Sequence, residues 1–83
     1  MTNKKEYETL QKLAKEIIES HTGFKTSYKD FTLLESGTNK DGKVDYIQFI
    51  RFGFPNIIYT SHLVNNSYDL RIDNKKTLES LDI

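Results

Sequence analysis

The chain contains no cysteine, so neither a disulfide bond nor a cysteine-based zinc site can stabilise it. It carries no excess of either charge, because twelve basic residues balance twelve acidic ones. No apolar run approaches the roughly 20 residues of a membrane-spanning helix, and residues 1–6 do not resemble the apolar part of a secretory signal. These absences predict a cytoplasmic protein that does not cross a membrane.

A chain of 83 residues has room for one hydrophobic core, so we expect a single domain, residues 1–83. Hydrophobic residues make up 36% of the chain and aromatic residues 12%, which is more than a disordered chain carries. Because no disulfide contributes, the stability of the fold must come from apolar packing. Self-association, as a homodimer, would add to that packing.

The N-terminal segment predicts an amphipathic helix. Asn3 and Glu6 have the spacing of a capping box at its start, and Gly23 supplies the left-handed residue that ends many helices. The outer face is charged and is expected to face solvent. Steps of three and four residues separate the members of the apolar stripe, which are Tyr7, Leu10, Ala14, Ile17, Ile18 and His21.

The region that follows the helix predicts four β-strands, because short runs of β-branched and aromatic residues alternate there with turn residues. The expected strands are residues 31–35, 44–54, 57–64 and 68–72. Leu78 and Leu81 lie in a charged tail, residues 74–83, that predicts a short C-terminal helix. The predicted fold is therefore α+β: one N-terminal amphipathic helix on a four-stranded, mostly antiparallel sheet.

The dipeptide Asp41-Gly42 predicts a two-residue hairpin turn between the first two strands. Such a turn places Lys40 opposite Lys43, and Leu33 opposite Ile50. One face of the hairpin then carries Phe31, Leu33, Val44, Tyr46, Ile50 and Phe52, and the other carries Leu34, Ile47 and Phe49. Because one helix covers one face, the second apolar face needs another cover.

Two covers for that second face are open at this point. One is the tail, through Leu78 and Leu81, and the other is a partner protein or a second copy of the chain. If the face serves association, the contact residues are expected to be Leu34, Ile47 and Phe49, with Arg51 at the rim and Tyr59 as an anchor on the neighbouring strand.

Residues 37–49 read Gly-Thr-Asn-Lys-Asp-Gly-Lys-Val-Asp-Tyr-Ile-Gln-Phe. The segment resembles the calcium loop of EF-hand proteins, and the matching positions are Asn39, Asp41, Gly42 and Asp45. Gly37 stands where the first aspartate belongs, and Gln48 replaces the bidentate glutamate, so two negative charges are missing. We therefore expect a hairpin turn without a metal or other cofactor, and keep a degenerate calcium loop as an alternative.

Residue types that catalyse reactions are scarce. Only His21 and His62 can act as bases near neutral pH, and no cysteine is available as a nucleophile. The chain lacks a Gly-x-Ser-x-Gly motif, a phosphate-binding glycine loop and a His-Glu-x-x-His motif. The sequence predicts that the protein is not an enzyme and has no catalytic residues.

Basic residues and tyrosines alternate in the strand region, as they do in proteins that stack single-stranded bases. The zero net charge argues against nucleic acid as the main ligand, so weak single-strand binding is an alternative. By exclusion, we predict a small protein-interaction module. In size and composition the chain is similar to accessory proteins of bacteria and phages, including stoichiometric inhibitors such as anti-CRISPR proteins. This similarity is one of kind and involves no shared motif.

Overall fold

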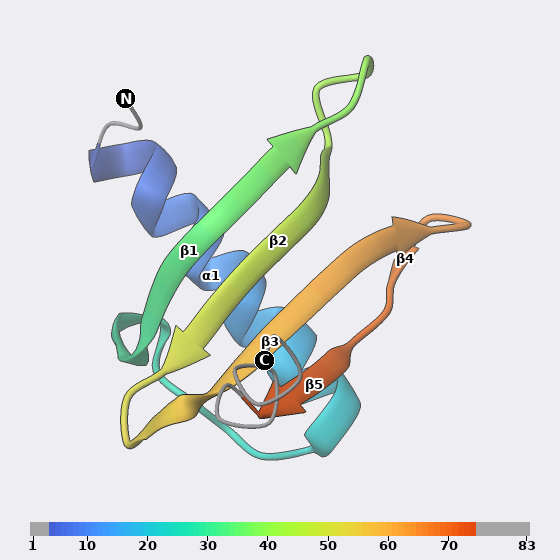
Figure 1. Cartoon of the computed structure of the whole chain (residues 1–83). Helices are drawn as coiled ribbons and strands as arrows, with labels where there is room; N and C mark the ends of the chain where they lie inside the picture. Colours follow the sequence, from blue (N-terminus) through green and yellow to red (C-terminus); the bar gives the residue numbers. More distant parts are fainter. Residues whose placement is uncertain (1–3, 75–83) are drawn as a thin grey trace, which may run out of the picture.

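The computed structural model describes residues 4–74 as an α+β fold, with a helix on one antiparallel sheet (Figure 1). Strands β1, β2 and β3 are consecutive neighbours, and both β4 and β5 pair with β3. The predicted fold class is confirmed. The elements are α1 (Lys4–Thr22), the 3-10 helix η1 (Tyr28–Asp30), β1 (Phe31–Thr38), β2 (Val44–Arg51), β3 (Phe54–Val64), β4 (Ser67–Tyr68) and β5 (Arg71–Asn74).

The C-terminal helix expected within residues 74–83 lies outside the described residues, except for Asn74, which ends β5. Asn3, the expected cap of the first helix, lies outside them as well. No helix in residues 4–74 combines the length and the apolar character needed to cross a membrane.

Helix α1 crosses one face of the sheet diagonally, behind the strands in Figure 1. Near its start, Gln11 donates a hydrogen bond of 2.9 Å to the backbone oxygen of Phe31 in β1. Near its end, His21 Nε2 lies 2.9 Å from the backbone oxygen of Tyr68 in β4. As predicted, the helix ends at Gly23, whose φ is +79° and whose amide donates to the oxygen of Glu19 at 2.9 Å. The helix therefore connects the two edges of the sheet.

The hydrophobic core lies between α1 and the sheet. Phe49 is at its centre: its ring meets that of Phe31 edge-on at 5.4 Å and stacks on that of Tyr59 at 5.4 Å. The helix contributes residues of its predicted apolar stripe. The buried hydrophobic residues are Ala14, Ile17, Ile18, Phe31, Ile47, Phe49 and Tyr59.

The β1–β2 hairpin has a three-residue loop and not the two-residue turn that Asp41-Gly42 predicts. Asn39 and Lys43 close the loop, since the Asn39 amide donates to the Lys43 oxygen at 2.8 Å. Gly42 adopts the left-handed conformation, with a φ of +81°. Three-residue hairpin loops with a left-handed residue at the end are the next most common type after two-residue turns.

Two irregularities in the pairing of β1 with β2, at Leu33/Glu35 and Gly37/Thr38, change the predicted register. Leu33 faces Phe49 and not Ile50, whereas the middle of the hairpin keeps the expected pairing, as in Ser36 opposite Ile47. A bulge of this kind shifts which residues share a face. As a result, residues expected on opposite faces lie together under α1. The prediction that Ile47 and Phe49 lie on the face that the helix does not cover is wrong, because both are fully buried in one cluster with Ala14, Ile17 and Ile18 of α1.

Strands β3, β4 and β5 form one long hairpin. Asn65 and Asn66 make its turn with φ angles of +51° and +65°, the left-handed values that a type I′ turn requires. One register runs through the hairpin: Val64 pairs with Ser67 next to the turn, and Thr60 pairs with Arg71 further along. β4 and β5 are therefore two segments of one strand, which corresponds to the expected strand at residues 68–72.

Candidate binding surfaces

The structure separates the five residues predicted to contact a partner. Ile47, Phe49 and Tyr59 are in the core and are not available to a partner in this fold. Leu34 is 48% exposed and lies in a groove between α1 and β1. Arg51 is half-buried at the C-terminal end of β2, where its guanidinium lies 5.4 Å from the ring centre of Phe54. The predicted residues thus do not form one surface.

Two phenylalanines that the sequence analysis did not select are exposed at the β2–β3 turn. Phe52 is 83% exposed and Phe54 is 45% exposed. The turn is tight, because Arg51 pairs with Phe54 and Gly53 takes a φ of +90° between them. The Phe52 amide also donates to the Asp30 oxygen at 2.7 Å, which fixes the turn to η1. The exposed rings are therefore held by a defined backbone.

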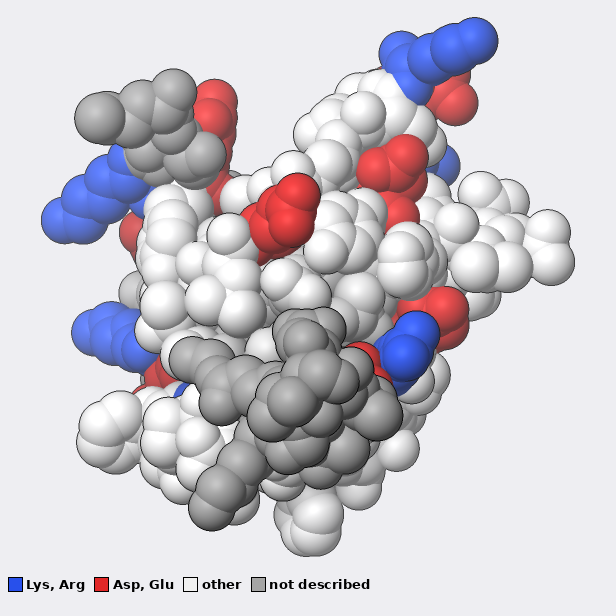
Figure 2. Space-filling model, in the orientation of Figure 1, with Lys and Arg blue, Asp and Glu red and all other residues white. Residues whose placement is uncertain are grey.

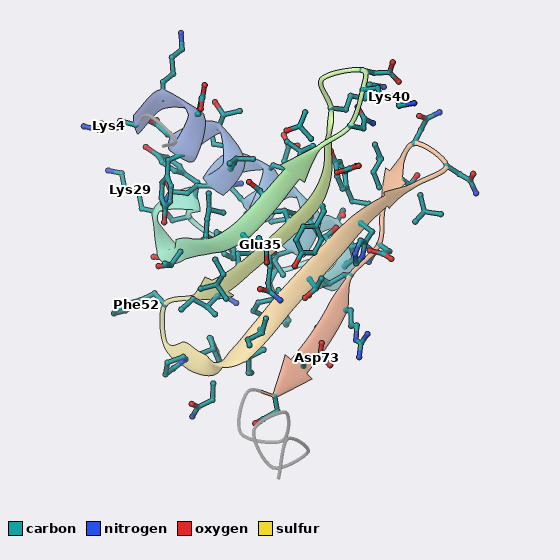
Figure 3. The ribbon with its side chains drawn as sticks, turned by 45° about the horizontal axis from the view of Figure 1, so that its top comes forward. Lys4, Lys29, Glu35, Lys40, Phe52 and Asp73 are labelled. Carbon is teal, nitrogen blue, oxygen red and sulfur yellow. The ribbon has the colours of Figure 1, made fainter. Side chains whose placement is uncertain are left out.

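A hollow of about 610 Å³ opens beside this turn. η1 supplies Lys29 and Asp30, β2 supplies Arg51, and the turn supplies Phe52. Lys29 and Phe52 lie toward one end of the sheet, and Lys40 lies at the opposite end (Figure 3). We call this hollow, which Phe52 lines and which Phe54 adjoins in the chain between Gly53 and Pro55, the aromatic hollow. Its remaining lining residues are Thr32, Ile50, Gly53 and Pro55.

A row of polar side chains crosses the sheet face that α1 leaves open. The rings of Tyr46 and His62 are 5.2 Å apart on neighbouring strands. Burial, followed by the negative charge of Glu35, raises the pKa of the Tyr46 phenol above its ordinary value of 10.0. The His62 amide donates to Asp69 Oδ1 at 2.6 Å, and His62 Nδ1 is 3.9 Å from the same oxygen. Figure 2 shows acidic side chains in the middle of this face and Lys and Arg mostly at its margins.

The His62 and Asp69 side chains of this row are open to water. The side chains of His62 and Asp69 are about half exposed, at 52% and 53%. Water therefore screens the interaction between these two side chains. Within residues 4–74, no group of three or more His, Cys, Asp or Glu side chains is placed to hold a metal ion.

The segment that resembles a calcium loop is a β-hairpin connection. Asn39 Oδ1 accepts hydrogen bonds from the amides of Asp41 at 2.9 Å and Lys43 at 3.0 Å, so it organises the turn. Gly37 and Gln48, at the two positions that depart from the calcium-loop pattern, lie within β1 and β2. The hairpin loop thus gives Gly42 and Asn39 of the motif a structural role.

Three of the alternating basic residues and tyrosines have partners or packing within the fold. Tyr59 is buried, and the Tyr68 hydroxyl donates to the Val44 oxygen at 2.6 Å. Arg71 pairs with Asp73, with an Nε–Oδ2 distance of 3.1 Å. A platform of stacked bases needs exposed aromatic faces along one groove. The buried ring of Tyr59 offers no such face.

No protein-family model, curated protein sequence or solved structure matches this chain. A functional proposal therefore depends on the geometry of the chain itself. The signal for the aromatic hollow was present in the sequence, where Phe52 and Phe54 flank Gly53 and Pro55 follows. Proline cannot donate a ladder hydrogen bond and is confined to edges and irregular stretches of sheets, so a turn near these phenylalanines was indicated.

Proposed function

We propose that this domain is a non-enzymatic protein-interaction module that binds a partner protein through the aromatic hollow. The observation that carries the proposal is the exposure of Phe52, at 83%, next to Phe54 on a turn with a fixed backbone. Aromatic side chains and arginine dominate the binding energy of protein interfaces, and Arg51 lies over the Phe54 ring and lines the hollow with Phe52.

The energetics favour burial of the β2–β3 turn against another molecule. Covering an exposed phenylalanine contributes about 1.5–3 kcal/mol through its apolar area. Because the Phe52 amide is bonded to Asp30, little backbone freedom is lost when the turn is covered. The combination of a large exposed apolar side chain and a preorganised backbone is therefore suited to binding.

The proposed partner is a protein, and the proposed role is stoichiometric, as an inhibitor or accessory protein that occupies a surface. A cytoplasmic location fits the absence of cysteine. This role requires the occupation of a surface and needs no catalytic group.

The test combines capture and measurement. A photo-crosslinking phenylalanine analogue at position 52 is used to trap the partner in cells, and the purified partner is then titrated with wild-type, Phe52→Ser and Phe24→Ser proteins. Phe24 is the matched control, because it is 70% exposed but does not line the hollow. Sedimentation velocity of the chain alone establishes whether a second copy is the partner.

We expect Phe52→Ser to weaken binding by at least about tenfold, which corresponds to 1.4 kcal/mol, and Phe24→Ser to leave it unchanged. Equal affinities of the wild-type and Phe52→Ser proteins would remove the basis for the proposal. A larger loss with Phe24→Ser would move the binding surface to the end of α1.

A further inference from the structure

We infer that the partner places an acidic side chain in the aromatic hollow, where Arg51 binds its carboxylate while Phe52 packs on an adjacent apolar residue. This inference rests on the proposed function and specifies the chemistry of its partner. It is carried by the charges that line the hollow and by the way Arg51 is held.

Arg51 is oriented but has no acidic partner within residues 4–74. Its guanidinium carbon lies 5.4 Å from the centre of the Phe54 ring, and it forms no salt bridge with any residue of the described part of the chain. The other arginine, Arg71, is paired with Asp73 at 3.1 Å. When a guanidinium stacks on an aromatic ring, its N–H donors point outward in the plane of the group and remain available to a carboxylate.

The hollow has a positive balance of charge. Lys29 and Arg51 are its two cations and Asp30 is its one anion, and Lys29 is exposed without an ion pair to any described residue. Two cations around one anion attract a carboxylate and repel an ammonium group. Next to them, Phe52 and Pro55 offer apolar surface. The hollow is thus complementary to an acidic residue with an aliphatic or aromatic neighbour.

A nucleic acid fits this site less well than an acidic protein segment. A single carboxylate needs only Arg51 and Lys29, whereas a strand of nucleic acid brings a phosphate with every nucleotide and needs a continuous basic path. The open sheet face nearby carries acidic side chains at its middle, among them Glu35 (Figures 2 and 3), and the whole chain has no net charge. We therefore commit to a protein segment.

The experiment uses defined probes and the full chain. Three short synthetic peptides share one pattern of leucines and differ in the intervening residues, which are aspartate, serine or lysine, and a short oligothymidine is the fourth probe. Each probe is titrated into isotope-labelled protein, and the shifts of the Phe52 and Gly53 amides and of Arg51 Nε are followed. The aspartate peptide should give saturable shifts that disappear at high salt, because screening weakens charge pairs.

Four variants test the assigned roles. Arg51→Gln should weaken the aspartate peptide about tenfold, as expected for the loss of a charged hydrogen bond, and Arg51→Lys should restore only part of the affinity. Asp30→Asn should strengthen binding, since it removes the one anion of the lining. Lys40→Gln, at the opposite end of the sheet in Figure 3, is the control and should have no effect.

The outcomes separate this inference from the proposed function. If Phe52→Ser abolishes binding of the captured partner while Arg51→Gln leaves it unchanged, the protein-interaction module stands and the acidic partner is rejected. Absence of binding by the aspartate peptide, or equal binding by the lysine peptide, also rejects it. Tighter binding of oligothymidine than of the aspartate peptide identifies a nucleic-acid site and overturns both proposals.

Discussion

The hydroxyl oxygen of Tyr7 accepts a hydrogen bond of 3.1 Å from the backbone amide of Leu33. One helical turn later, Gln11 donates to the backbone oxygen of Phe31. β1 is an edge strand, and unpaired edge groups are sites for pairing with other chains. Helix α1 therefore both covers the core and satisfies polar groups on the exposed edge of the sheet.

Replacing Tyr7 with phenylalanine should lower the free energy of unfolding by about 1 kcal/mol, because it removes the acceptor of the Leu33 amide. Urea unfolding followed by circular dichroism measures this change. Tyr28→Phe is the matched control: the Tyr28 hydroxyl has no hydrogen-bond partner within residues 4–74, and the change should stay below about 0.5 kcal/mol. Equal losses in the two variants would contradict the edge-capping role of Tyr7.

Phe49→Ala and Phe52→Ala should differ strongly in stability. Phe49 is fully buried between the rings of Phe31 and Tyr59, and such truncations cost about 3–5 kcal/mol. A domain of this size then unfolds at room temperature. Phe52 is exposed, so its truncation should change the unfolding free energy by less than about 0.5 kcal/mol. A folded Phe49→Ala protein with an unchanged midpoint in thermal denaturation would show that the core is assigned wrongly.

The turn of the long hairpin depends on the left-handed conformation of Asn66, whose φ is +65°. Asn66→Ala should lower the free energy of unfolding by about 1 kcal/mol, since residues other than glycine and asparagine rarely adopt this conformation. Asn66→Gly should not lower it, because Asn-Gly is favoured in type I′ turns. Asn56→Ala, at an exposed position without a positive φ, is the control in the same thermal denaturation series.

Glu19 makes the connection after α1 sensitive to acid. The hydrogen bond from Lys15, followed by that from the Thr26 amide, lowers the pKa of the Glu19 carboxyl below its ordinary value of 4.5. Both donors approach Oε2 at 2.7 Å. Because the pKa is lower in the folded protein, the contribution to stability is present above the unfolded value and is lost as the pH falls through the folded value.

The Thr26 amide reports this titration by NMR. Its chemical shift should change with an inflection below pH 4.5, the ordinary value for the carboxyl. Glu19→Gln should abolish the inflection, whereas Glu8→Gln, whose side chain pairs with Lys12 on α1, should retain it. An inflection that persists in the Glu19→Gln protein would assign the acid sensitivity to another group.

Local signals in the sequence predict most of the fold. Apolar residues at steps of three and four identify α1. Gly23 marks its end, because many helices end at a residue in the left-handed conformation and glycine adopts that conformation readily. The runs at residues 57–64 and 68–72 and the asparagines between them predict the β3–β5 hairpin. Each of these features depends on neighbours in the chain, so one sequence is sufficient to find it.

The assignment of faces depends on interactions that the sequence does not display. The pattern of β2 correctly separates Ile47 and Phe49 from Tyr46 and Ile50. The bulge near Leu33 then determines which residues of β1 share a face with Ile47 and Phe49, and the position of that bulge depends on tertiary packing. The same error hid the aromatic hollow, because the predicted register placed Phe52 opposite Phe31 on an inner face. In the structure Phe31 faces Arg51, and the side chain of Phe52 is exposed at the turn.

The diagonal course of α1 has a consequence for synthesis on the ribosome. Tyr7 contacts Leu33, 26 residues later in the chain, whereas His21 contacts Tyr68, 47 residues later. The helix leaves the ribosome before the sheet does, and Ile17 and Ile18 lack the β3 part of their core until Tyr59 has been made. The apolar stripe of α1 therefore lacks its full set of packing partners until most of the sheet has been synthesised. The partners of Tyr7 are synthesised before those of His21, so the contacts of α1 become available from its N-terminus toward its C-terminus. Early release of the chain, before β4, would leave a helix attached at one edge only.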